Sequence, residues 1–302
     1  MKEITNKNNT LKLCVDDIHA EPVALFNSHG ENLLWKGDAQ YWDKHDPILF
    51  PTVGKSYEGH IRVQGKVYDM PKHGFAQNGP WQVVEHGVTA EGDGLLILEF
   101  RESDSTRQYY PFPFVVRQCF ELTDNALRVT WQVSSDVDLP FMMGAHPAFA
   151  LPDFDPADEV HGYLQFDMPE IKSQIVLPDG HLHSEYEMVH LQEGNLLPLG
   201  NSTFECDTLL DIRGINRKVT LLDKHRNPIL TLSHSMPVIA IWAPQSGCCP
   251  FVCIEPWSGG CDAPGYVGEF SERPFMQHVK DGETWTTHYD ITINSSLVTK
   301  RS

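Results

Sequence analysis

Four short passages of the chain combine turn-forming residues with polar side chains that can do chemistry. They are Phe50-Pro-Thr-Val-Gly-Lys55, His73-Gly-Phe-Ala-Gln77, Gly144-Ala-His-Pro-Ala-Phe149 and Cys253-Ile-Glu-Pro-Trp257. Each passage pairs a potential catalytic or binding group with an aromatic or apolar anchor, and each lies at or just beyond a predicted strand. Loops on a rigid scaffold commonly carry function. His73, His146 and Glu255 are therefore the candidate catalytic side chains in these passages.

Glu255 is the most informative of these residues taken singly. It follows the apolar run Phe-Val-Cys-Ile, where we expect it to end a strand, and it precedes Pro-Trp. The carboxyl should then be partly buried beside an indole, and burial raises a carboxyl pKa towards the range useful for proton transfer. The alternative is a structural role in which Glu255 pairs with a nearby arginine. A single His beside Gly or Pro is more often a turn residue than a catalyst.

Short β-strands are the elements that must position these side chains. Leu127–Ser134 alternates apolar and polar residues strictly, which is the pattern of a half-buried strand. Ile61–Tyr68 is predicted to be a hairpin with its turn at Gln64-Gly65. Further strands are predicted at Trp81–Glu85, Leu95–Arg101, Phe114–Leu122, Lys218–Leu222, Ile229–Ser233, Val238–Trp242 and Phe251–Glu255.

The predicted fold is all-β, with two large antiparallel sheets packed face to face and few short helices. Helical periodicity is nearly absent, and only Phe275–Lys280 is expected to form a helical turn or two. Pro152–Asn201 is expected to form long loops along one edge. Because no linker or internal repeat divides the chain, residues 1–302 are predicted to be a single domain, with loose ends before about Leu11 and after about Ser296.

The charge balance argues against several classes of partner. The chain has 23 basic and 41 acidic residues, for a formal net charge of −18. Nucleic acids and anionic membranes need a basic footprint, so neither is expected as a partner. A neutral or weakly charged small molecule is favoured. A phosphorylated ligand would require a few basic side chains gathered locally.

Segments for export or membrane insertion are not expected. The first ten residues are polar, and the longest apolar passages, such as Val238–Pro244, are too short to span a bilayer. Seven cysteines at irregular spacing make a poor disulfide framework. The sequence thus predicts a cytoplasmic protein with reduced thiols.

The motifs, taken in order, resemble those of the aldose 1-epimerase (galactose mutarotase) superfamily, and most closely its branch of shorter bacterial proteins of the LacX type. The joint occurrence of these motifs is far more specific than any one of them. They are Trp42 with Pro47–Gly54, Met70–Ala76, Gly144–Phe149, Phe204–Leu209, Ile241-Trp242, Pro250–Trp257 and Asp262.

This resemblance implies a large two-layer β-sandwich with an open sugar cleft across one sheet, and no metal or organic cofactor. Mutarotases interconvert α and β anomers by opening the hemiacetal, rotating about C1–C2 and closing on the other face. The chemistry requires two titratable groups with opposed duties, both near neutral pKa. Carried over by motif, Glu255 would be the general base on O1 and His146 the general acid at the ring oxygen. His73 would hydrogen-bond the ring-oxygen region.

The resemblance also implies residues that bind the substrate. Asp207 would bind sugar hydroxyls, and Trp242 or Trp257 could offer the flat apolar face that sugar C–H groups favour. Lys55 and Gln77 fall at binding positions where the family usually has Arg, so a planar guanidinium clamp is not expected there. Galactose, glucose, another aldose and a sugar phosphate all remain candidate substrates.

Two other interpretations compete with the enzyme. His181-Leu-His183, Glu187 and Gly194 match the spacing of the metal-binding motif of cupins, in which imidazoles and a carboxylate hold a divalent metal. No Gly precedes at the expected distance, and no second cupin half is evident. The other is a non-catalytic carbohydrate-binding or sensing protein of the same fold. The enzyme is favoured over it because a binding module has no chemical need for an acid and a base in one cleft.

Overall fold

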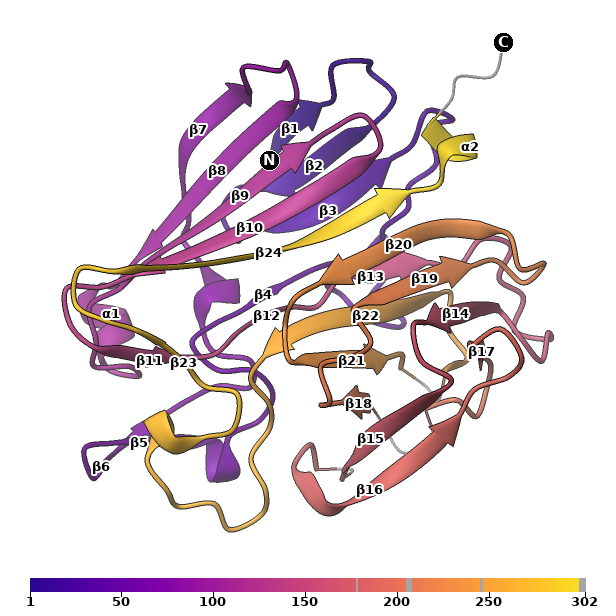
Figure 1. Ribbon diagram of the computed structural model, residues 1–302. Coiled ribbons are helices and arrows are strands. Elements are labelled where there is room, and N and C mark those ends of the chain that lie inside the picture. Colours follow the sequence, from indigo (N-terminus) through magenta and orange to yellow (C-terminus); the bar gives the residue numbers. More distant parts are fainter. Residues whose placement is uncertain (178, 205–207, 245–246, 299–302) are drawn as a thin grey trace.

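Two large antiparallel β-sheets dominate the structure, a computed structural model that describes residues 1–177, 179–204, 208–244 and 247–298. Within these residues, nine strands form one sheet and eight form the other, and the two sheets lie as layers in Figure 1. The predicted all-β sandwich is confirmed. No helix in the described part of the chain combines the length and apolar character needed to cross a membrane.

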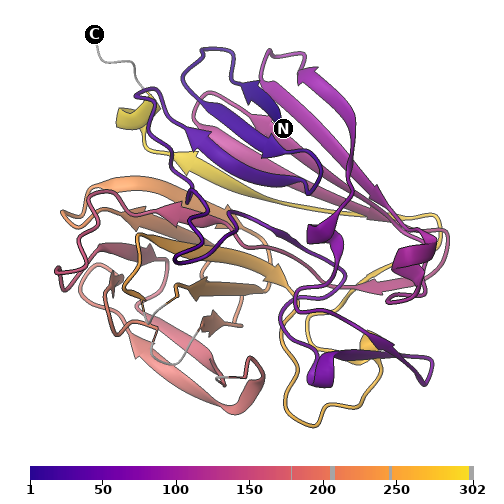
Figure 2. The ribbon, with the colours of Figure 1, turned by 180° about the vertical axis from the view of Figure 1, so that it is seen from behind.

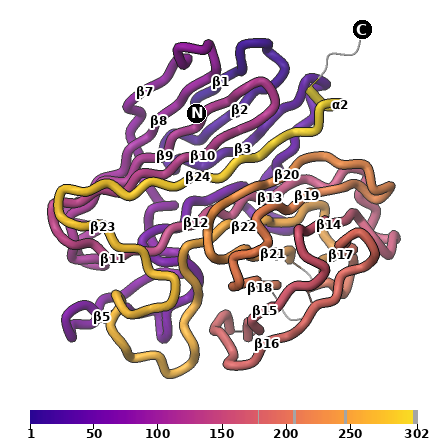
Figure 3. Tube along the Cα trace, viewed as in Figure 1, coloured from indigo at the N-terminus to yellow at the C-terminus, as the bar shows by residue number. Residues whose placement is uncertain are grey.

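The nine-stranded sheet has the order β17-β14-β19-β20-β24-β10-β9-β8-β7. Its strands are β7 (Gln82–Val88), β8 (Gly94–Arg101), β9 (Val115–Leu122), β10 (Ala126–Ser134), β14 (Gly162–Phe166), β17 (Leu196–Leu199), β19 (Lys218–Leu222), β20 (Pro228–His234) and β24 (Thr284–Ile293). Figure 3 shows the C-terminal strand β24 running through the middle of this sheet, between β20 and β10. The sheet therefore joins segments from both halves of the chain.

The eight-stranded sheet has the order β16-β15-β18-β21-β22-β12-β4, and β13 also pairs with β22. Its strands are β4 (Ile48–Leu49), β12 (Met143–Ala145), β13 (Ala148–Ala150), β15 (Glu170–Val176), β16 (Leu182–His190), β18 (Leu209–Asp211), β21 (Val238–Trp242) and β22 (Phe251–Ser258). Every residue of β22 is buried. This strand is therefore a rigid base for the side chains that it carries.

Smaller elements cover the ends of the two layers. Strands β1 (Lys2–Thr5), β2 (Lys12–Asp16) and β3 (Glu21–Phe26) form a sheet that lies behind β8–β10 in Figure 1 and in front of them in Figure 2. The other elements are β5 (His60–Val63), β6 (Lys66–Asp69), β11 (Leu139–Phe141), β23 (Gln277–Val279), α1 (Asp104–Arg107), α2 (Ser295–Val298) and the 3-10 turns Tyr57–Gly59, Ala76–Asn78 and Phe270–Glu272.

One continuous apolar core holds the layers together. Trp131 and Leu232 of the nine-stranded sheet and Ile241 and Ile254 of the eight-stranded sheet belong to the same buried cluster. Burying side chains of this size stabilises the fold by roughly 1.5–3 kcal/mol each. The core explains the alternation in β10, because Trp131 and every second residue on either side of it are buried.

Several predicted elements are confirmed, and others are wrong. The hairpin at Ile61–Tyr68 is present, with Gln64 and Gly65 at φ 50° and 76° in its turn. Pro152–Asn201 was expected to be loops but contains β14–β17. The edge strand β16 is mostly exposed, so its polar sequence lacks the alternation that marks a half-buried strand.

Two further segments also differ from expectation. Residues 2–5, where a loose end was predicted, form β1 and pair with β2. The helical turn predicted at Phe275–Lys280 is instead strand β23, because Gln277–Val279 pair with β11. The partner of β23 lies far away in the sequence, so a local pattern does not reveal that strand, whereas β1 pairs with the neighbouring strand β2.

Candidate active site

Strand register brings His146 and Glu255 face to face. Gly144 of β12 lies opposite Trp257 of β22, and Ala148 of β13 lies opposite Cys253. The same register, continued across the two-residue link between β12 and β13, sets His146 opposite Glu255. The Nε2 atom of His146 lies 3.3 Å from Oε2 of Glu255, and both residues are buried. Glu255 was expected to end its strand, but β22 continues through Ser258.

His73 reaches the same place from a tight turn. Its backbone adopts the left-handed region at φ 65°, and Gly74 follows at φ 73°. A Cβ on Gly74 would lie 2.2 Å from the Phe50 carbonyl oxygen, so only glycine allows this close approach. The Gly54 N–H donates to Nδ1 of His73 at 3.1 Å, which leaves the proton of the neutral imidazole on Nε2. Nε2–H is then a hydrogen-bond donor for a ligand.

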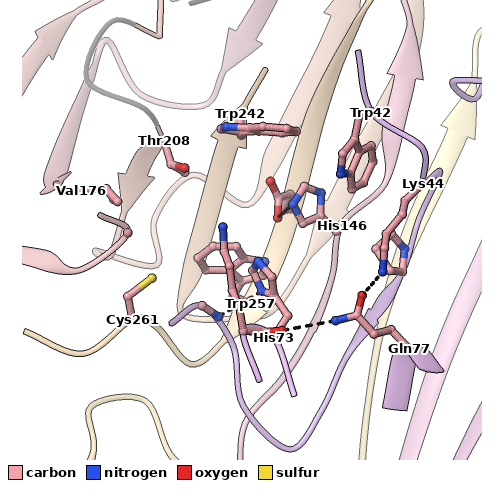
Figure 4. A pocket seen from close by; sticks show the side chains of 15 residues that line it. Trp42, Lys44, His73, Gln77, His146, Val176, Thr208, Trp242, Trp257 and Cys261 are labelled. Carbon is pink, nitrogen blue, oxygen red and sulfur yellow. Dashed lines mark hydrogen bonds and ion pairs between the residues drawn. The ribbon is translucent and has the colours of Figure 1, made fainter. Parts of the chain in front are cut away.

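These three residues line a cavity of about 350 Å³ together with aromatic side chains. Trp42 and Trp242 lie beside His146, with ring centroids 4.7 and 5.6 Å from its imidazole. Figure 4 shows Trp42 and Trp242 above His146, and Trp257 with His73 below it. Flat apolar walls around a few polar groups are typical of a small-molecule site.

The ionisation of the two histidines follows from their surroundings. Burial, followed by the positive charge of Lys72, lowers the pKa of His146 to about 3. Burial, followed by the charge of His146, lowers the pKa of His73 well below its usual range. The expectation that the acid would have a near-neutral pKa is therefore not met for His146. Glu255 is the neighbour whose negative charge favours the imidazolium of His146.

Asp46 supports His146 from the protein side and was not foreseen from the sequence. The backbone N–H of His146 donates to Oδ1 of Asp46 at 3.2 Å, and the Tyr289 hydroxyl donates to Oδ2 at 3.2 Å. Burial, followed by the negative charge of Glu21, raises the pKa of Asp46 to about 8. The one available signal was its position directly before the Pro47–Gly54 motif.

Comparison with known proteins agrees with this geometry. The model of the family described as aldose 1-epimerase matches residues 24–292. The chain belongs to the aldose 1-epimerase family. Among relatives, the chromosomal protein LacX of Lactococcus lactis subsp. lactis is 25% identical over 308 residues, which covers 95% of this chain and 98% of that protein. The resemblance to the LacX-like branch is therefore confirmed.

Two further relatives extend the comparison. A solved structure, the galactose mutarotase related enzyme of Lactobacillus acidophilus, superposes with a TM-score of 0.87 at 27% identity and covers 97% of this chain and 98% of that one. A putative glucose-6-phosphate 1-epimerase of Escherichia coli (strain K12) is 24% identical over 280 residues, 82% of this chain and 84% of that protein. The fold is thus that of the galactose mutarotase-like members of the family.

The other residues assigned by family resemblance are found in different situations. Trp242, Trp257 and Gln77 line the cavity. Lys55 does not, because its Nζ donates to the Asp179 carbonyl oxygen at 2.7 Å. Asp207 lies outside the described residues, so its role stays a prediction.

Cavity-lining residues that sequence reasoning had not assigned to the site include Trp42, Lys44, Lys72 and Thr208. Trp42 had been noted only as part of the family's motif series. Lys72 had likewise been included only as part of the Met70–Ala76 motif, and Lys44 carries no local signal, since a lysine in a loop is ordinarily a solvated surface residue.

The cupin-like alternative does not agree with the structure. His183 and Glu187 both lie on the extended strand β16, where residues four apart are about 13 Å from each other, too far to hold one ion. His181 lies before that strand and pairs with Asp179 at 3.0 Å.

Among the described residues, only His146, Cys253 and Glu255 bring three potential metal-ligand atoms within 4.8 Å of one another. Burial, followed by the charge of Glu255, raises the pKa of Cys253 well above its usual range. Its thiol therefore stays protonated, and a thiol is a poor metal ligand. The spacing of these three residues would suit a metal ion, but the protonated thiol of Cys253 would not.

Proposed function

We propose that the protein is an isomerase that interconverts the α and β anomers of an aldose by acid–base ring opening. The observation that carries this proposal is the buried pair of His146 and Glu255, 3.3 Å apart in an aromatic-lined cavity. The hydroxyl oxygen O1 and the ring oxygen of a hemiacetal share one carbon, so their acid and base must lie close together. The pair meets this requirement.

The proposed reaction moves one proton on and one proton off the sugar. The Glu255 carboxylate accepts the proton of the O1 hydroxyl while His146 gives a proton to the ring oxygen, and the C1–ring oxygen bond breaks to leave an aldehyde. After rotation about C1–C2, the ring oxygen returns its proton to His146 as it attacks C1, and Glu255 returns its proton to O1. The enzyme is regenerated and no cofactor enters the balance.

The pKa of His146 limits how often this exchange can begin. With a pKa of about 3, His146 is neutral in most molecules near pH 7, so the reacting imidazolium is a minor but strongly acidic form that the adjacent Glu255 carboxylate stabilises. The Nε2–H of His73 can donate to the ring-oxygen region, with its tautomer held by the Gly54 N–H. Trp42 and Trp242, which pack beside His146, can offer flat apolar faces to the sugar ring.

The test is the anomeric equilibration of freshly dissolved α-glucose and α-galactose, followed by polarimetry or NMR. We expect the wild type to accelerate it, and Glu255→Gln and His146→Ala to lose roughly 10²–10⁴-fold in rate, the usual contribution of a general acid or base. Glu85→Gln on β7 and His288→Ala on β24 are matched controls, because both side chains are exposed on the nine-stranded sheet.

Two results would contradict the proposal. If the wild type accelerates no aldose but still binds one, the chain is a carbohydrate-binding protein. If Glu255→Gln retains full activity, the base is another group.

A further inference from the structure

Asp46 is a buried acidic residue in direct contact with His146, and the proposed reaction does not use it. Only 3% of its surface is exposed, and it is not among the described residues that line the cavity. Its Oδ1 accepts the backbone N–H of His146 at 3.2 Å. A buried carboxyl is costly unless hydrogen bonds compensate it, so its partners show where it acts. The first of these partners is the residue proposed as the acid.

The chain around Asp46 holds the two-residue link between β12 and β13 on which His146 lies. The Asp46 carboxyl accepts the N–H of His146 at the start of the link. The His45 carbonyl oxygen accepts the N–H of Ala148, at its end, at 2.9 Å. Two neighbouring residues thus fix the link at both ends, and the backbone that carries the His146 imidazole is held in one position.

Asp46 also connects this link to the other layer of the fold. Its Oδ2 accepts the hydroxyl of Tyr289 on β24, a buried residue of the nine-stranded sheet, at 3.2 Å. Its backbone N–H donates to Oε1 of Glu21 on β3 at 3.1 Å. The carboxyl therefore joins His146, which belongs to the eight-stranded layer of Figure 1, to a strand of the opposite layer.

The groups that face Asp46 determine whether its carboxyl is charged. Burial, followed by the negative charge of Glu21, raises the pKa of Asp46 to about 8, while the bonds from the His146 N–H and the Tyr289 hydroxyl lower it. The carboxyl is thus mostly neutral at pH 7 and becomes negative as the pH rises through about 8. Two further titratable residues lie around it: His45, which pairs with Glu21 at 3.4 Å, and Cys253 of β22, whose pKa is raised in part by Asp46.

A charge on Asp46 changes the acid–base balance of His146. The imidazolium of His146 is a minor form near pH 7, because the pKa of this residue is about 3. A carboxylate bonded to the backbone of the same residue stabilises the imidazolium, since a nearby opposite charge favours the charged form. A neutral carboxyl holds the link but gives no such stabilisation.

We propose that Asp46 is a positioning residue that fixes His146 and, through its own charge, sets how readily the imidazole carries a proton. This inference rests on the proposed function, because it concerns His146 as the acid of ring opening. The proton that Asp46 loses passes to solvent, and the anomerisation itself is unchanged. At a given pH, the form of the enzyme with a charged Asp46 transfers its proton more often than the form with a neutral Asp46.

The experiment compares kcat and KM of the wild type and Asp46→Asn from about pH 6 to about pH 9.5, after subtraction of the buffer rate. Asparagine keeps an acceptor for the His146 N–H but cannot ionise. The ratio of wild-type to variant kcat should be constant below about pH 7, and should rise roughly threefold to tenfold through pH 8. KM should stay unchanged, because Asp46 does not line the cavity.

Asp43→Asn is the matched control, because Asp43 is an exposed aspartate of the same segment. Its kcat should follow that of the wild type at every pH. If the ratio for Asp46→Asn does not change with pH, Asp46 acts through packing alone, and the inference is overturned while the proposed function stands.

Two variants that keep Asp46 should move the pH dependence in opposite directions, each measured against its own Asp46→Asn double variant. Glu21→Gln keeps an acceptor for the Asp46 N–H but removes the charge that raises the Asp46 pKa, so the rise should move to lower pH. Tyr289→Phe removes a hydrogen bond that lowers this pKa, so the rise should move to higher pH. Shifts in the same direction would overturn the assignment of the rise to Asp46.

NMR tests the inference even if no sugar is turned over. The backbone amide proton of His146 is bonded to Asp46, so its chemical shift should titrate around pH 8 in the wild type and stay constant in Asp46→Asn. An amide that does not titrate in this range overturns the inference independently of catalysis. Titration of this amide without anomerisation of any aldose overturns only the proposed function.

Discussion

Strands β10 and β22 run through the interiors of the two large sheets, yet they bury their side chains differently. In β10 every second residue is buried, and Arg128 and Gln132 between them are exposed. In β22 all the side chains are buried, including the charged Glu255. Polar side chains of β10 can therefore form hydrogen bonds with water, whereas those of β22 need hydrogen-bond partners within the protein. Removing a buried partner therefore costs more free energy of folding than removing an exposed one. The same burial shifts the pKa values of the titratable residues in the site.

The largest expected effect comes from two aspartate–arginine pairs with similar bonds but different burial. Asp211 of β18 is buried and accepts bonds from Arg213 and from Asn216 at 2.6 Å, while Asp290 of β24 pairs with the exposed Arg128. Asp211→Ala should lower the free energy of unfolding by about 3 kcal/mol, because Arg213 and Asn216 lose a buried partner. Asp290→Ala should cost only about 0.5 kcal/mol. Urea denaturation measures both, and equal losses would contradict the distinction between the sheets.

A smaller effect is expected from adding one methyl group to a glycine in each sheet. A Cβ on Gly144 of β12 would lie 2.7 Å from Cδ1 of Trp257 and 3.2 Å from Cδ1 of Leu49, whereas a Cβ on Gly87 of β7 would meet nothing within 4 Å. Gly144→Ala should therefore destabilise the protein by about 1–3 kcal/mol and displace the indole beside the site. Gly87→Ala should change stability by less than about 0.5 kcal/mol. Thermal unfolding together with tryptophan fluorescence tests this pair, and an unperturbed Gly144→Ala would show that the eight-stranded sheet is more loosely packed.

The last comparison concerns Asp46 and is a change of stability with pH. Its folded pKa of about 8 lies above the unfolded value of about 3.9, so its stabilising contribution is complete below pH 4 and is lost as the pH rises through 8. The loss should approach about 1.4 kcal/mol per pH unit within that window. Asp46→Asn keeps an acceptor for the His146 N–H but cannot ionise. Its stability relative to the wild type should increase steadily from pH 5 to pH 8 in denaturation series, and a constant difference would rule out the buried, protonated carboxyl.

Much of the fold could be predicted because its signals are local. The alternation at Leu127–Ser134 and the Gln64-Gly65 turn each depend on a few adjacent residues, and both are confirmed. The failures share a cause. Strand β16 lies exposed at an edge, and β23 exists because β11 lies beside it, so neither carries its own local pattern.

For the site, the sequence by itself determined which residue types were available: His73 in a glycine turn, His146 before a proline and Glu255 in an apolar strand. Only the tertiary structure decided their geometry, because the register that opposes His146 and Glu255 joins strands more than a hundred residues apart. It also decided that Gln77 holds Lys44, a partner 33 residues away, so that the cation of the cleft comes from a loop that no motif marked. Contacts of this kind are set by the packing of the whole chain, and local residue patterns carry no information about them.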